Sequence, residues 1–113
     1  MSMKHTDSLK KIFENASTGK LTIYTPCDQE LYFQGRECSL SCDVKIHDWS
    51  IIEMIKKRGD IGLGEAYHLG LWESSNLSNF LTYCCLNLSK LTKVVDGNFF
   101  NRMLLVFITS LFD

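Results

Sequence analysis

The chain has 113 residues, of which 45% are hydrophobic and 22% charged, and its formal net charge is −1. This size fits one domain with its own hydrophobic core, and the lack of net positive charge argues against nucleic acid as a partner. The five cysteines are an odd set without a Cys-x-x-Cys motif, and no secretory signal pattern opens the chain. We therefore expect reduced thiols in a cytoplasmic protein.

The first half of the chain predicts a short helix followed by three strands. Residues 7–16 carry apolar side chains at helical spacing, and alternating patterns predict strands at 20–25, 30–34 and 38–46. A turn at Pro26 would join the first two strands into a hairpin. In the third strand, one set of side chains is apolar and the alternate set is polar, so one face of this strand should be buried.

A helix follows, with its N-cap at Asp48 or Ser50 and a capping box between Ser50 and Glu53. It should end at Gly59, because glycine adopts left-handed backbone angles without strain. Three cations in its last turn would complement the helix dipole.

Beyond a glycine-rich stretch at 59–72, two more helices are expected, at 76–91 and 99–112. The longest apolar run, 103–112, is far shorter than the roughly 20 residues that a membrane-spanning helix needs, so we expect no transmembrane segment.

These elements predict an α+β fold in which helices pack on one face of a small antiparallel sheet of at least three strands. We expect residues 1–113 to form a single domain. It would comprise an N-terminal helix or tail at 1–18, a core at 19–91 and an apolar C-terminal helix at 97–113.

The glycine-rich stretch invites comparison with a nucleotide-binding loop, because Gly62 and Gly64 form a G-x-G motif. Such a loop follows a buried strand, whereas here a capped helix precedes the glycines. Tyr67 also occupies the place of the third glycine. A tight connection into a strand or short helix is the better interpretation.

Three side chains of this stretch are candidates for lipid or partner contact. Glu65 could cap backbone amides of the glycine turns or face a partner domain or lipid headgroup. Tyr67 and Trp72 pair an apolar body with a polar tip, which suits the edge of a core, a domain interface or a membrane interface.

Lys56, Lys57 and Arg58 form a local basic cluster. They could be a solvated helix end that complements the dipole, or they could contact anionic phospholipid headgroups.

We assign no catalytic residue and no metal site. A zinc site drawn from Cys38, Cys42 and His47 is disfavoured, because Cys38 and Cys42 stand two same-face steps apart in one strand, more than about 6 Å. No set of nucleophile, base and orienting residue can be assembled from the sequence.

The order of motifs resembles the N-terminal region of cyclopropane-fatty-acyl-phospholipid synthases. The likeness covers roughly residues 18–91 and depends on an opening strand at 19–23, on 44–48 and on the signature at 59–67, followed by Gly70, Trp72, Asn76 and Leu77. Leu71 departs from the acidic residue usual in the family. The same order is more loosely similar to the lipid-binding fold of sterol carrier protein 2.

The resemblance implies a non-catalytic module that helps to hold an enzyme on membrane lipid. S-adenosylmethionine would be bound by the family's methyltransferase domain, and no cofactor is expected on this chain. The expected partner is a phospholipid or acyl chain, with peripheral placement at the inner membrane face. The alternative is an interaction module that docks a separate methyltransferase domain or forms a homodimer.

Overall fold

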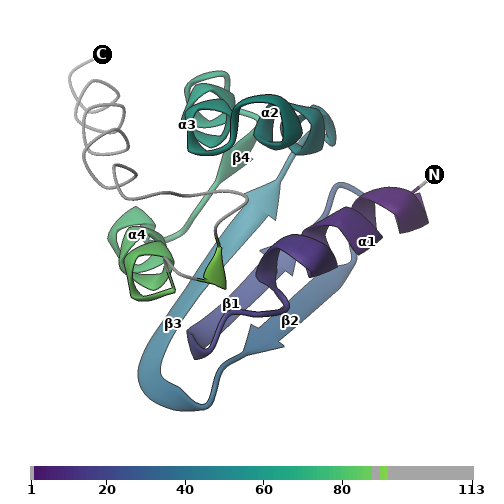
Figure 1. Ribbon diagram of the computed structural model, residues 1–113. Helices are drawn as coiled ribbons and strands as arrows, with labels where there is room; N and C mark the ends of the chain where they lie inside the picture. The colour runs from purple at the N-terminus through teal and green to yellow at the C-terminus, as the bar shows by residue number, and fades with distance from the viewer. Residues whose placement is uncertain (1, 88–89, 92–113) are drawn as a thin grey trace.

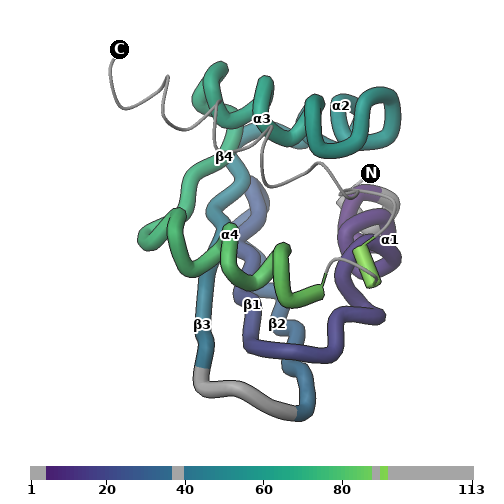
Figure 2. Tube along the Cα trace, turned by 60° about the vertical axis from the view of Figure 1, so that its left-hand side comes forward, coloured from purple at the N-terminus to yellow at the C-terminus, as the bar shows by residue number. Residues whose placement is uncertain are grey.

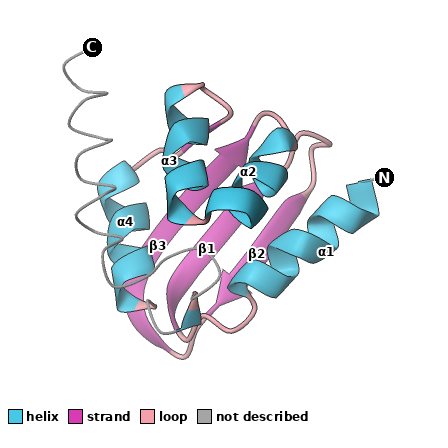
Figure 3. Cartoon of the chain, turned by 45° about the horizontal axis from the view of Figure 1, so that its top comes forward, coloured by secondary structure: helices cyan, strands magenta, loops and turns pink. Residues whose placement is uncertain are grey.

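The computed structural model describes residues 2–87, 90 and 91, with side chains described for 5–36, 40–87, 90 and 91. Within these residues, helices cover one face of a four-stranded sheet (Figures 1 and 3). The α+β class is thereby confirmed. The predicted helix at 99–112 lies outside the described residues. In chain order the elements are α1 (Ser2–Phe13), β1 (Thr18–Tyr24), β2 (Glu30–Gln34), β3 (Glu37–Ile46), α2 (Ser50–Arg58), α3 (Asp60–His68), β4 (Trp72–Glu73) and α4 (Leu77–Leu86).

The sheet is mixed, in the order β2–β1–β3–β4, which corrects the antiparallel arrangement that we expected. The β1–β2 hairpin and the β3–β4 pair are antiparallel, whereas β1 and β3 are parallel. The prediction assumed that strands adjacent in sequence are adjacent in the sheet, which is only a tendency. Here β3 passes β2 and pairs with the other edge of β1.

Gly35 makes this crossing possible. Residues 35 and 36 pass the chain at the beginning of β1, where the Gly35 amide donates to the Gly19 carbonyl at 2.8 Å and the Arg36 amide donates to the Ser17 carbonyl at 3.0 Å. A Cβ on Gly35 would lie 2.5 Å from the Ser17 carbonyl carbon and oxygen. Since backbone cannot yield as a flexible side chain can, the close approach requires glycine.

The alternating patterns of the strands correctly predicted their buried faces. Leu21 and Ile23 of β1 and Val44 and Ile46 of β3 are buried, and their polar neighbours point to the opposite face. Leu9, Ile12 and Phe13 bring α1 onto this apolar face. The core therefore lies between the sheet and the helices.

The beginning of α2 differs from the predicted capping box. Trp49 is the N-cap residue, and its side chain makes no capping bond with the described residues. The Asp48 carboxylate instead accepts a hydrogen bond from the Ser50 amide at 2.8 Å, and this bond lowers the pKa of Asp48. Of the helix or tail expected at 1–18, the structure has a helix from Ser2, and within it the His5 ring stacks on Trp49 with centroids 4.9 Å apart.

Candidate functional site

The glycine-rich stretch folds as α3 and β4, side by side with α2 near the end of the sheet where β3 finishes (Figure 2). Gly59 separates α2 from α3 with a positive φ of 58°. A Cβ on Gly62 would lie 2.0 Å from the Met54 carbonyl oxygen of α2. The glycines therefore bring two helices into close contact, and a phosphate-binding loop does not form here.

Trp72 belongs to the core. Its side chain is 1% exposed, and its indole N–H donates to the Leu63 carbonyl at 2.9 Å. Its ring packs against Phe80 and against Tyr67, with centroids 5.4 and 5.1 Å away. Because it is buried in this way, the Trp72 side chain cannot contact lipid directly. Tyr67 is half-buried and covers it.

Glu65 lies on the exposed side of α3 and forms an ion pair with Arg58. The carboxylate Oε1 and the guanidinium Nη1 are 2.5 Å apart. Of the alternatives for Glu65, capping of amides in glycine turns does not fit, because the stretch is helical and the carboxylate pairs with Arg58 at the end of α2. An exposed pair of this kind contributes up to about 1 kcal/mol to stability.

Two large apolar side chains flank Glu65, one within α3 and one at its C-cap. Ile61 is 42% exposed and Leu69 is 67% exposed, each four residues from Glu65 along the chain. A four-residue spacing places side chains on one helical face. We call Arg58, Ile61, Glu65 and Leu69 the α3 outer surface, a mixed apolar and charged strip.

The basic cluster gains a member that the sequence did not reveal. Lys56, Lys57 and Arg58 are exposed in the last turn of α2, and α1 brings Lys11 beside Lys56. These two lysines line a groove of about 410 Å³ between α1 and α2, together with Ser8, Ile12 and Ile55. The only sequence signal was that Lys11 stands off the apolar face of its helix.

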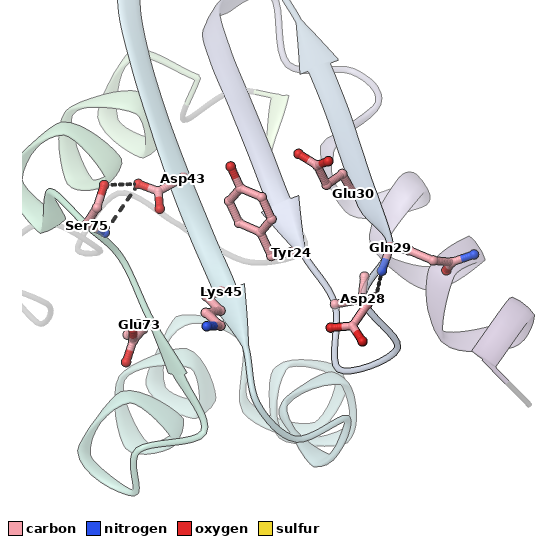
Figure 4. A pocket seen from close by; sticks show the side chains of 9 residues that line it. Tyr24, Asp28, Gln29, Glu30, Asp43, Lys45, Glu73 and Ser75 are labelled. Atoms are coloured by element: carbon pink, nitrogen blue, oxygen red, sulfur yellow. Dashed lines mark hydrogen bonds between the residues drawn. The ribbon is translucent and has the colours of Figure 1, made fainter.

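The open face of the sheet has the opposite electrostatic character. A hollow of about 440 Å³ is floored in part by Tyr24 and lined by four carboxylates and a single lysine (Figure 4). Asp43 accepts hydrogen bonds from the Ser75 amide, at 3.2 Å, and from its hydroxyl. The carboxylates of this hollow are Asp28, Glu30, Asp43 and Glu73. Such a face repels anionic ligands.

Burial suppresses the chemistry of the Cys42 and Cys84 thiols. Burial, and secondarily the charge of Asp43, raises the pKa of Cys42 to about 12, and burial raises the pKa of Cys84 well above 9.0. Thiols of this kind are poor nucleophiles at neutral pH because the thiolate is the reactive form. Among the described residues, no three His, Cys, Asp or Glu side chains gather into a group that could hold a metal ion.

The described helices are also too short or too polar for any of them to cross a bilayer. No family model, curated protein or solved structure matches this chain.

Proposed function

We propose that this chain is a non-catalytic accessory domain that associates with lipid in a cyclopropane-fatty-acyl-phospholipid synthase-like methyltransferase. The observation that carries the proposal is the combination of exposed cations at the end of α2 with exposed Ile61 on the adjoining α3 and exposed Leu69 at its C-cap. Mixed basic and apolar surfaces are typical of peripheral membrane contacts. The domain would act at the cytoplasmic face of the membrane.

The energies suit reversible association. Each cation close to an anionic membrane contributes about 1 kcal/mol, and full burial of an Ile or Leu side chain contributes about 1.5 to 3 kcal/mol. Cations alone would bind weakly, so the apolar side chains are needed. Glu65 offsets part of the charge of Arg58, which leaves Lys56 and Lys57 as the main electrostatic contacts.

The charge distribution supports one orientation of the domain. The basic cluster lies on the helical side, and the carboxylate-lined hollow lies on the opposite face of the sheet. Anionic lipid would attract the first and repel the second. Membrane contact through α2 and α3 leaves the acidic face in water.

Co-sedimentation with phosphatidylglycerol-containing vesicles tests the proposal. We expect the protein to bind, and Lys56→Gln/Lys57→Gln to bind about thirtyfold more weakly, from about 1 kcal/mol per cation. Lys20→Gln/Lys45→Gln is the matched control, because it removes the same charge from the open sheet face. Leu69→Asp should also weaken binding.

An equal loss of vesicle binding in the two double-lysine variants would indicate an effect of net charge and would contradict membrane contact through α2. Absence of vesicle binding by the unmodified protein would refute lipid association. Light scattering and capture of a methyltransferase would then identify the alternative, a protein-interaction module.

A further inference from the structure

The groove between α1 and α2 combines two cations with an apolar floor. Lys11 and Ile12 line it from α1, and Ile55 and Lys56 line it from α2, together with Ser8. The two lysines stand 45 positions apart in the sequence and line one groove only because α1 packs beside α2. We propose that this groove binds the phosphate headgroup of an anionic phospholipid.

Charge complementarity is the first support for this ligand. Lys11 forms no ion pair with any described residue, and the Lys56 ammonium lies 4.0 Å from the Glu53 carboxylate, a distance at which the attraction between exposed groups is weak. Both ammonium groups can therefore turn toward a phosphate. As compact charges on flexible stems, lysines suit an anion that needs no fixed bidentate geometry.

The apolar floor distinguishes a lipid from a free anion. Ile12 and Ile55 are 9% and 5% exposed, so each offers only a narrow apolar surface at the base of the groove. Inorganic phosphate gains nothing from that surface, whereas the glycerol and first acyl carbons of a phospholipid would cover it. The volume of about 410 Å³ is within the range of small-molecule sites.

This inference rests on the proposed lipid association and gives it a specific headgroup site. In the binding mode that it implies, one headgroup is held between α1 and α2 while Lys57 and the α3 outer surface contact the surrounding bilayer. Lys11 lines the groove and is not part of the proposed membrane contact through α2 and α3. Its substitution should therefore weaken headgroup binding in the groove and leave the other membrane contacts unchanged.

Methyl NMR of the isotope-labelled isoleucines tests the groove directly. The probe is dihexanoyl phosphatidylglycerol below its micelle-forming concentration, compared with dihexanoyl phosphatidylcholine and with sodium phosphate. We expect saturable shifts of the Ile12 and Ile55 methyls with phosphatidylglycerol, and no shift of Ile23, which is buried in β1. Lys11→Gln should weaken this binding about fivefold, and Lys11→Gln/Lys56→Gln about thirtyfold.

The Lys20→Gln/Lys45→Gln variant should titrate like the unmodified protein. Unmoved Ile12 and Ile55 methyls, or equal affinity in Lys11→Gln/Lys56→Gln, would overturn the groove site even where vesicles still bind. Sodium phosphate that binds as tightly as phosphatidylglycerol would overturn the assignment to lipid. Groove shifts without vesicle binding would instead refute membrane association and leave the headgroup site intact.

Discussion

Asn87 is the buried side chain that ties the end of α4 to the beginning of β1. Its amide oxygen accepts hydrogen bonds from the Ser17 and Thr18 amides at 2.9 and 3.0 Å. Its amide nitrogen donates to the Thr18 and Tyr83 carbonyls, each at 2.8 Å. Both donors and both acceptor positions of the side chain are thus satisfied at 0% exposure. The predicted helix at 76–91 instead ends at Leu86, beside this residue.

We expect Asn87→Ala to lower the free energy of unfolding by about 3 kcal/mol. The substitution removes four hydrogen bonds and leaves the backbone groups that made them unsatisfied in a partly buried site. Urea denaturation measures the change. Asn79→Ala, within α4, is the control. It removes one side-chain bond, to the Ser41 carbonyl at 3.3 Å, and should cost about 1 kcal/mol or less. Similar losses in both variants would contradict the role given to Asn87.

At the scale of elements, the contact between α2 and α3 depends on Gly62. In most helix interiors alanine is more stable than glycine by about 1 kcal/mol. Here a Cβ would lie 2.0 Å from the Met54 carbonyl oxygen, so the helices would have to separate. The packing of this pair therefore explains a glycine that local helix propensity disfavours.

We expect Gly62→Ala to destabilise the protein by about 1 to 3 kcal/mol, the usual cost of overpacking, despite its better helix propensity. Thermal unfolding followed by circular dichroism measures this change. Gly70→Ala provides the comparison, because no described atom lies within 4 Å of its Cβ position and only its positive φ of 75° opposes alanine. That strain costs about 1 to 2 kcal/mol. Stabilisation by Gly62→Ala would show that the helices are not in tight contact.

Element prediction succeeded where the pattern was local and failed where a partner was distant. The strand at 30–34 matches β2, and the alternation of β3 correctly predicted its buried face. The sequence did not predict the helix at 60–68, because glycines are unfavourable in an isolated helix. Their presence is explained only by the close packing of this helix against α2.

At the scale of the whole molecule, the core holds ionisable groups in their neutral forms. Burial raises the pKa of Cys42 from 9.0 to about 12, and burial also raises the pKa of Tyr83 and Cys84. The Cys42 thiol also donates to the Lys20 carbonyl at 3.5 Å, which favours its protonated form. Above pH 9.0 the unfolded chain therefore binds fewer protons than the folded protein.

The stability provided by the neutral thiols should be fully present below pH 9.0 and should be lost as the pH rises toward 12. Urea midpoints measured across this range, under reducing conditions, check the expectation. Cys42→Ala should be less stable at neutral pH and should show a shallower alkaline decline. A midpoint that stays constant above pH 9.0 would contradict burial of these groups in the folded state.

The sequence by itself determined the α+β class, the buried faces of the strands and the basic cluster at 56–58. Side-chain alternation and helical spacing are local properties, readable without knowing which elements meet. Only the tertiary structure decided the mixed sheet, because the pairing of β3 with β1 depends on a close crossing at Gly35. It also buried Trp72 and placed Lys11 and Lys56 on the lining of one groove, since each arrangement depends on how separate elements pack.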